Sequence, residues 1–547
     1  MKEDQIHALN IATTETTKNE RLENDIIIGK DVLELLTSSM YVNPLNIFRE
    51  YVQNSVDSID QAAKVGVLDS HESGQIDIEI DNVNRTIKVR DNGLGVSNKD
   101  FEKTLTAFGS SYKRSQKEAR GFRGVGRLAG LGYCQELIFR TKTNSDSQIK
   151  EMTWNCVQLK SLLADPSYGG SLQDLVKQVV RTSTSEDKEA DSSFFEVIMK
   201  KVIRTSKNDR LMNPDIICSY ISQVAPVPFH KDFSHGKKIQ DFLNMNLGTD
   251  YKTYNIDFTL QSERSDIFPE DVTKRLYKPL RDVYKIDKTK EDKISKIEFF
   301  EVLGNEETAA VGWIAHTSYL GALPLTSPLK GLRIRHGNIQ IGEHNLLEEV
   351  FTESRFNNWS IGEIHILDHQ IKPNGRRDNF EQSVHYRNLL NHLKVEADKL
   401  SKICRDTSAQ RNRIKHGSSQ VLSIKEAIKA LDNVSHHQGL FADQVKVVEN
   451  KLILFSDYLD KLDKFDCSDS KSKYMLFEED KQKLFKDRTS LRSFFTKREN
   501  KLRKEKNLSN SRASHKTKII KGISSELEKA EVSKAVKKKI SKLLEKI

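Results

Sequence analysis

Hydrophobic and polar residues repeat with a helical period in residues 43–60. At about 100° per residue, four apolar side chains fall on one stripe of the helix. They are Phe48, Val52, Val56 and Ile59. Glu50, Asn54 and Asp57 fall together on the opposite side, so the pattern predicts an amphipathic helix that begins near Pro44. Such a polar face is usually only solvated, but a carboxylate one turn before an amide can also hold a water and a hard cation.

An alternation of period two follows and predicts a β-hairpin. Apolar and polar residues alternate on both sides of a polar turn at residues 81–85. The second strand leads into D-N-G-L-G, where Gly93 and Gly95 allow a sharp turn and a close approach of the backbone to a planar ligand. Asp91, at the end of the strand, could accept a hydrogen bond from an exocyclic amine such as adenine N6. A lone D-x-G-x-G is more often an ordinary turn.

A third motif concentrates glycines at the start of a helical stretch. Gly121, Gly124 and Gly126 would present backbone N–H donors at a helix N-terminus, an arrangement that suits phosphate. The spacing matches neither the P-loop, which ends in G-K-[ST], nor a dinucleotide fingerprint after a strand. The preceding residues 96–120 are polar and basic. They fit either a mobile lid over an anion or an ordinary exposed loop.

The chain divides into four stretches of different texture, which predict an α+β fold. Residues 1–205 hold the motifs above, and residues 206–380 alternate strand-like runs with short helices, as in a second α/β domain. Residues 381–467 are helical, and residues 468–547 are predicted to be partly helical and partly frayed. The strand-like runs are 253–259, 294–302, 309–316 and 331–341.

One helical seam can be identified in the third stretch. Seven apolar residues step by alternating intervals of four and three, which is the a/d pattern of a coiled coil. They are Phe441, Val445, Val448, Leu452, Phe455, Leu459 and Leu462. The seam could pack on a helix of the same chain near Tyr386–Cys404 or join two copies in a homodimer, and the pattern favours neither.

Charge is unevenly distributed along the 547 residues. The formal net charge is 88 − 78 = +10. Residues 501–547 contain fifteen basic and five acidic residues, which also gives +10, so residues 1–500 are neutral. The excess positive charge therefore lies in the C-terminal tail. Lysines there could neutralise the phosphates of a nucleic acid, bind an acidic protein or only keep the chain soluble.

Composition disfavours several classes of protein. No apolar run approaches the ~18–20 residues of a membrane-spanning helix, and the sequence that follows Met1 lacks the apolar core of a signal peptide. The five cysteines include no C-x-x-C pair, which disfavours a zinc site or a disulfide framework. We therefore expect a cytoplasmic protein with reduced thiols and no membrane partner.

Taken together and in this order, the three motifs resemble the nucleotide-binding boxes of the GHKL superfamily. Its members include gyrase, the ninety-kilodalton heat-shock chaperones, histidine kinases and mismatch-repair MutL. The boxes E-x-x-x-N-x-x-D, D-x-G-x-G and G-x-x-G-x-G are all intact here, and Tyr41–Asp60 most resembles the chaperone helix. The resemblance covers residues 20–380, strongly to about residue 200. It implies a Bergerat-type α/β sandwich that binds ATP with Mg²⁺.

The resemblance also implies roles for individual residues. Glu50 would be the general base, Asn54 the magnesium ligand and Asp91 the residue that binds the adenine. The remaining nucleotide-binding positions would be Asp57, Gly93, Gly95, Ser110, Lys113, Gly121, Gly124, Val125, Gly126 and Ser193. Ser193 departs from the Gly-Thr pattern of the family. An acidic residue at Asp57 and an N-terminal nucleotide domain disfavour a histidine kinase.

A second catalytic residue is implied in the middle of the chain. Residues 371–380 resemble the middle-domain loop of the heat-shock chaperones, in which an Arg follows an Asn by three residues. Arg377 matches that position, and Arg376 is the fallback. A planar guanidinium could clamp phosphate oxygens as charge develops on them. Without the resemblance, this run is only an exposed turn.

The implied activity is slow ATP hydrolysis that drives a conformational switch, and three outputs remain open. The first is chaperone-like remodelling of a protein client or effector. The second is a clamp that closes around nucleic acid by dimerisation, as in MutL or the MORC ATPases, which the basic tail favours. The third is a non-hydrolysing ATP sensor that signals to an effector in stress or phage defence, which an intact Glu50 disfavours.

Overall fold

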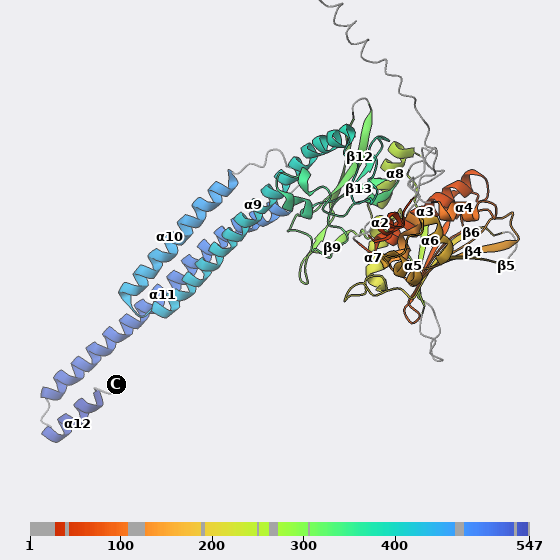
Figure 1. Cartoon of the computed structure of the whole chain (residues 1–547). Coiled ribbons are helices and arrows are strands. Elements are labelled where there is room, and N and C mark those ends of the chain that lie inside the picture. Colours follow the sequence, from red (N-terminus) through yellow and green to blue (C-terminus); the bar gives the residue numbers. More distant parts are fainter. Residues whose placement is uncertain are drawn as a thin grey trace, which may run out of the picture. The chain divides into compact units, whose positions relative to one another are not determined.

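The computed structural model describes residues 28–38, 43–107, 126–186, 192–248, 251–261, 272–304, 307–464, 475–529 and 533–544. The chain divides into two compact units (Figure 1). The first comprises the residues up to Thr317 together with Gly321–Asp398, and the second comprises Ser318–Leu320 together with Lys399–Ile547. No helix in these described ranges is both long and apolar enough to pass through a lipid bilayer.

The first unit contains an eight-stranded sheet with the order β5-β4-β3-β6-β2-β1-β7-β8. Its strands are β1 (Gln75–Asp81), β2 (Thr86–Asp91), β3 (Glu136–Lys142), β4 (Gln148–Asn155), β5 (Val180–Glu186), β6 (Phe194–Lys200), β7 (Asn255–Gln261) and β8 (Val272–Arg275). The predicted hairpin is confirmed, because β1 and β2 pair antiparallel with Ile76 opposite Asp91. Only β1 and β7 among these neighbours run parallel.

Helices cover one face of this sheet. The predicted amphipathic helix is α3 (Asn46–Lys64), and its apolar stripe is buried against β1 and β2. Residues of β1 alternate between buried and half-buried, so the other face of the sheet is polar. The remaining helical segments of this core are α2 (Asp31–Ser38), α4 (Phe101–Thr106), η3 (Gly126–Gly132), α5 (Cys156–Ala164), α6 (Leu172–Val179) and α7 (Pro214–Val224).

The predicted domain boundary at residue 205 needs correction. β7 pairs with β1 over its whole length, with Gln75 opposite Asn255, and β8 pairs with β7. Residues of α7 and β7 also belong to the same hydrophobic core as α3. The first sheet therefore extends to Arg275. The strand-like run 253–259 was predicted correctly as a strand, but its pairing partner lies far away in the sequence and left no local signal.

A second sheet follows in the same unit, with the order β11-β12-β15-β13-β14. Its strands are β11 (Lys296–Leu303), β12 (Thr308–His316), β13 (Gly331–His336), β14 (Ile339–Ile341) and β15 (Ile361–Ile366). They confirm the predicted runs 294–302, 309–316 and 331–341, the last as a hairpin. The helix α8 (Gly236–Leu247) packs on this sheet through Ile239 and Leu243. A two-stranded ribbon of β9 (Val283–Lys285) and β10 (Glu291–Lys293) accompanies it.

A buried ionic cluster connects the second sheet to α7. Glu363 accepts hydrogen bonds from Lys278 Nζ at 2.7 Å and from Arg335 Nε at 2.6 Å, and Arg335 also donates to the carbonyl of Gln223. Burial opposes the ionised form of Glu363, but Arg335 and Lys278 outweigh it and hold its pKa well below the usual range. Burial lowers the pKa of the neighbouring His365 to about 4.

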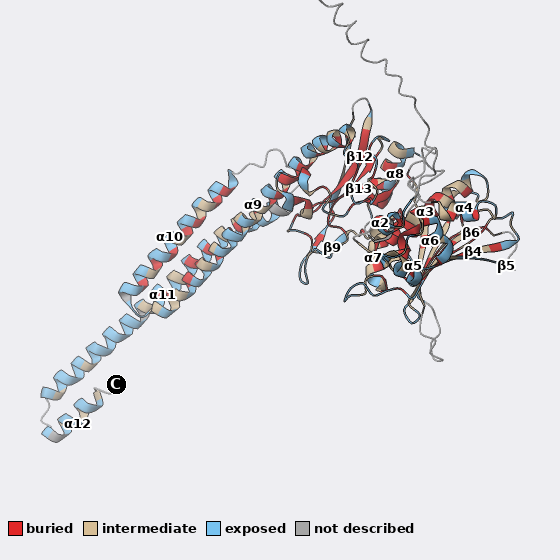
Figure 2. Ribbon diagram, in the orientation of Figure 1, coloured by how far each residue is buried: buried red, intermediate tan, exposed pale blue. Residues whose placement is uncertain are grey.

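The second unit is a helical bundle. Its elements are the part of α9 (Val384–Val434) beyond Asp398, α10 (Gln438–Asp463), α11 (Met475–Lys529) and α12 (Lys534–Leu544). All seven residues of the predicted seam are buried on α10. They pack against α9 at Val421–Leu431 and against α11 at Leu484–Leu502 (Figure 2). The seam therefore packs within the chain, but on residues beyond 420 and not on Tyr386–Cys404, because α9 continues far past that point.

Candidate nucleotide site

The polar face of α3 is not solvated. Glu50 is 7% exposed and Asp57 is 4% exposed, while Asn54 is half-buried. Two further polar residues of the same helix, Arg49 and Gln53, are 3% and 1% exposed. A helix whose charged side is covered in this way must find partners for its charges, because an unpaired buried ion is costly. The partners of Glu50 are its neighbour Arg49 on α3 and Arg377, which lies far away in the sequence.

Two arginines and a glycine surround the Glu50 carboxylate. Arg377 Nε lies 3.5 Å from Glu50 Oε1, and Arg49 Nη2 lies 3.6 Å from the same oxygen. On the other side, a Cβ built on Gly126 would lie only 2.3 Å from Glu50 Oε2. Gly126 begins η3, which is tied to α3 because Gly130 N donates to the Tyr51 hydroxyl at 2.9 Å. Gly126, the last glycine of the third motif, therefore lies directly against the Glu50 carboxylate.

Arg377 is held in place through its backbone. Arg49 donates to the carbonyl oxygens of Arg377 at 3.2 Å and of Arg376 at 2.9 Å, and Gly342 N donates to the Arg377 carbonyl at 2.9 Å. Arg377 has φ +56°, a left-handed conformation that a non-glycine residue adopts only when its surroundings impose it. Arg376, the fallback, is exposed and pairs with Asp378. Arg377 is the arginine that reaches Glu50.

The D-x-G-x-G turn forms a second wall beside α3. Asp91 is 2% exposed at the end of β2, and one of its oxygens accepts from Gly93 N at 3.0 Å. A Cβ on Gly93 would lie 2.3 Å from Ser58 Oγ, and Ser58 Oγ also accepts from Leu94 N at 3.1 Å. Gly95 has φ +71°, and a Cβ there would strike the Lys142 carbonyl at 2.2 Å. Only glycine fits at 93 and 95.

Ser193 contributes to this turn. Its hydroxyl donates to the Gly93 carbonyl at 2.6 Å, and its side chain is 7% exposed. Thr141, on the neighbouring strand β3, is fully buried; its hydroxyl donates to the Phe194 carbonyl at 2.8 Å and accepts from Val96 N at 2.9 Å. Both hydroxyls therefore hold the D-x-G-x-G backbone against β6.

Several predicted positions lie outside the residues that the structure describes. They are Ser110, Lys113, Gly121, Gly124 and Val125. The residues that sequence reasoning missed are Arg49, Ser58 and Thr141. Arg49 stands beside the predicted base and could have been noticed as a cation next to it. Thr141 and Ser58 occupy ordinary polar positions of a strand and a helix, and nothing local marks them.

The donor set fits a nucleotide better than a preformed metal cage. Within the described ranges, no group of three His, Cys, Asp or Glu residues is placed to hold a metal ion. Mg²⁺ commonly takes one or two protein oxygens and completes its shell with water and substrate phosphates, so a single amide such as Asn54 is compatible with it. On the Oε2 side of the Glu50 carboxylate, Gly126 places backbone close by without a side chain of its own. These features are compatible with Mg-ATP at this site.

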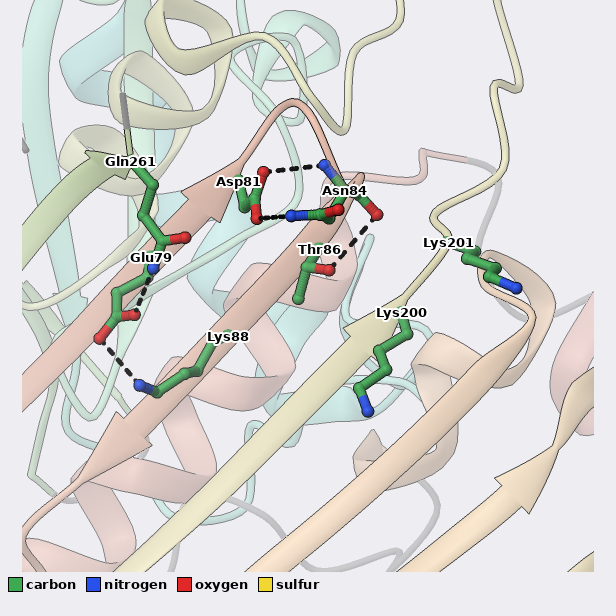
Figure 3. A pocket seen from close by; sticks show the side chains of 8 residues that line it. All are labelled: Glu79, Asp81, Asn84, Thr86, Lys88, Lys200, Lys201 and Gln261. Atoms are coloured by element: carbon green, nitrogen blue, oxygen red, sulfur yellow. Dashed lines mark hydrogen bonds and ion pairs between the residues drawn. The ribbon is translucent and has the colours of Figure 1, made fainter. Parts of the chain in front are cut away.

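The polar face of the same sheet offers no comparable chemistry. A shallow hollow there lies between β1, β2, β6 and β7 (Figure 3). Glu79 in this hollow accepts from Lys88 at 3.0 Å and from Gln261 at 3.2 Å, and Asp81 accepts from the Asn84 side chain at 2.7 Å. These side chains bind mainly one another across the strands, which is typical of a stabilising cross-strand ladder.

Among the described residues, a helix-covered sheet brings the acid–amide helix α3 beside the D-x-G-x-G turn and Gly126, which is the arrangement expected of a nucleotide-binding α/β sandwich. Residues 44–181 match the family described as histidine kinase-, DNA gyrase B-, and HSP90-like ATPase. This segment is therefore similar to the ATPase domains of the GHKL superfamily, as the sequence motifs indicated.

Curated relatives agree with that similarity. The chaperone protein HtpG of Fusobacterium nucleatum is 27% identical over 130 residues, which is 21% of each chain. HtpG of Coxiella burnetii is 25% identical over 205 residues, covering 34% of this chain and 31% of the relative. The chain thus spans less than a third of the relatives it matches. The ATPase region of Saccharomyces cerevisiae topoisomerase II is 14% identical, with a TM-score of 0.36 over 66% of this chain and 85% of that one.

Proposed function

We propose that this protein is a magnesium-dependent ATP-hydrolysing conformational switch. One observation carries the proposal: Arg377, from the segment that follows the second sheet, lies 3.5 Å from Glu50 on the nucleotide-domain helix. A hydrolytic site assembled from two segments more than 300 residues apart is complete only when they are together. Nucleotide state and segment position are then coupled, which is how lids and domains gate many ATPases.

The chemistry is assigned to the chain's own side chains. Glu50 accepts a proton from the attacking water as general base. Arg377 supplies positive charge to the γ-phosphate oxygens as the bond between the γ-phosphorus and the departing ADP oxygen weakens. Bound Mg²⁺, with Asn54 as a ligand, would supply charge neutralisation between the phosphates. Asp91 would accept the adenine amine, and Gly126 would let the phosphates approach the backbone.

Arg49 positions the loop that carries Arg377. Its two hydrogen bonds go to the backbone carbonyls of Arg376 and Arg377, and its charge sits beside Glu50. A movement of the Glu50 end of α3 therefore also moves the loop that carries Arg377. Arg49 acts through that loop and not on the nucleotide, so it is a positioning residue.

Chaperone-like remodelling of a protein client is the output that we favour. Its support is the similarity of the N-terminal part of the chain to HtpG chaperones. The client itself would be recruited by surfaces outside the matched residues. Stimulation of ATP turnover by an unfolded protein, and not by nucleic acid, is the result expected from this output.

The deciding experiment separates binding from hydrolysis. Glu50→Ala should keep Mg-dependent ATP affinity within about threefold while turnover falls by at least ~10²-fold, because the base acts only in the chemical step. Asp91→Asn should abolish binding, because an amide would present an N–H donor to the adenine amine. Calorimetric titration with a slowly hydrolysed ATP analogue gives the affinity, and phosphate release gives the turnover. Wild-type turnover by Glu50→Ala would rule out the proposed base.

A further inference from the structure

The C-terminal end of the chain carries a strongly basic helical segment. We define the basic arm as residues 503–529 of α11 together with α12. It holds thirteen basic residues and three acidic ones, which gives a net charge of +10. The remainder of the chain is close to neutral. The positive net charge of the protein therefore comes from this arm and not from its overall composition.

The arm extends beyond the core of the helical bundle. Leu502 is the last α11 residue that belongs to the bundle core. After it, no side chain that the structure describes on α11 or α12 is buried (Figure 2). Ile519 and Ile523 are 53% and 42% exposed. Within the second unit, the arm therefore has surface available for a partner.

The middle of the arm has no acidic residues with which its cations could pair along the helix, although ion pairs occur at the ends of its α11 part, where Arg503 pairs with Glu499 and Lys529 with Glu526. Solvent-exposed single helices are usually supported by opposite charges three or four residues apart. Here the twenty residues between Glu505 and Glu526 contain no acidic residue, although they include Lys506, Arg512, Lys516, Lys518 and Lys521. They also include five serines, two asparagines and a glycine, which are weak helix formers. No acidic residue within this stretch relieves the repulsion among its cations, and a polyanion would relieve it.

We propose that the basic arm binds the phosphate backbone of duplex DNA without reading its sequence. In the α11 part of the arm, the cations lie on all sides of the helix rather than in one stripe. This suits a helix of about 10–12 Å diameter lying between the two phosphate strands of a major groove about 12 Å wide. Lysine and arginine neutralise phosphates by charge alone and release counterions.

Two other polyanions fit less well. Single-stranded nucleic acid is held mainly by bases stacked on aromatic rings, and no Phe, Tyr or Trp follows Phe495. A membrane surface would need a continuous apolar face to insert. In α12, Val536 and Leu543 are 43% and 58% exposed, and Ile540 and Leu544 are of intermediate exposure. The longer α11 part of the arm has cations on all sides of the helix, and they interrupt any such face. Duplex phosphate remains the partner that the arm's chemistry favours.

The test uses the full-length protein and a fluorescent 30-base-pair duplex, with no nucleotide present. Affinity is measured by anisotropy across a series of salt concentrations. The arm variant replaces Arg512, Lys516, Lys518 and Lys521 with Gln. Its matched control replaces four exposed lysines of the bundle, Lys425, Lys429, Lys446 and Lys461, with Gln. Both variants lose four positive charges, so they differ only in where the charge was.

We expect the arm variant alone to lose affinity. Each phosphate contact contributes about 0.9 to the slope of log K against log salt, so the slope should become shallower by about 3–4 units, while the control variant keeps the wild-type slope.

Three results would overturn the proposal. They are equal losses in the two variants, tighter binding to single-stranded DNA or polyglutamate than to the duplex, and binding to phosphatidylserine vesicles with none to the duplex. Because the measurement needs no ATP, failure of the nucleotide site would leave this test unaffected.

Discussion

A methyl group at Gly126 should disable the proposed general base without unfolding the protein. An added Cβ would lie 2.3 Å from Glu50 Oε2, whereas ordinary van der Waals contact begins at 3.4 Å. The carboxylate must therefore retreat by about 1.1 Å in Gly126→Ala. It can do so, because the atom that is struck is the end of a flexible side chain and not backbone. The fold should adjust locally.

The size of the effect follows from that displacement. A misplacement of about 1 Å in a catalytic group can cost ~10²-fold in rate, and a general base contributes ~10²–10⁴-fold in total. We therefore expect kcat for ATP hydrolysis to fall by about 100-fold, which is ~2.7 kcal/mol of activation free energy. The melting temperature should move by no more than about 2 °C, because little packing is lost.

The assay measures two quantities on each variant. Phosphate release at saturating Mg-ATP gives kcat, and titration calorimetry with a non-hydrolysable analogue gives the dissociation constant. The matched control is Gly169→Ala, because a Cβ at Gly169 meets no heavy atom within 4 Å. The control should keep wild-type values for both.

Two results would refute this reasoning. If Gly126→Ala hydrolyses ATP within threefold of the wild-type rate, contact between η3 and Glu50 does not position the base. If affinity falls by 100-fold while kcat is unchanged, Gly126 acts through phosphate binding alone.

Two further predictions concern the elements around the site. Arg49→Gln removes two hydrogen bonds from a charged donor, which together contribute about 3 kcal/mol to docking of the Arg377 loop. The kcat for ATP hydrolysis should therefore fall by about 100-fold while the ATP dissociation constant stays unchanged. An unchanged kcat would contradict the positioning role of Arg49. In the folded protein the pKa of His365 is about 4, whereas in the unfolded chain it is near 6.5. The unfolded chain therefore binds a proton that the folded protein does not, and the free energy of unfolding should fall by about 2–3 kcal/mol between pH 6.5 and 4.5. Urea titrations should show a flatter decline for His365→Phe.

Much of the first domain could be predicted from its local patterns. The α3 stripe, the β1–β2 hairpin and the acidic residue at the end of β2 each show in a few consecutive residues. The strands of the second sheet were also visible as short apolar runs. These elements are predictable because their buried residues recur with the period of the element, every three to four residues in a helix and every two in a strand.

The remaining features depend on partners far apart in the sequence. The boundary at residue 205 was misplaced because β7 completes the first sheet only by pairing with β1. The α10 seam marks a buried face, but nothing in its spacing distinguishes α9 and α11 from a second copy. Thr141 could not be identified, because its role lies in two hydrogen bonds to the backbone of other segments.

The parallel pairing of β1 with β7 has a consequence for synthesis. Gln75 emerges from the ribosome long before Asn255, so β1 spends that interval with one edge unsatisfied. An exposed strand edge is a template for pairing with another chain. A fragment that ended at residue 205 would keep the three nucleotide motifs, but the edge of β1 that pairs with β7 would stay unpaired. For this protein, the shortest soluble ATP-binding piece should end after Arg275, well past the point at which its motifs end.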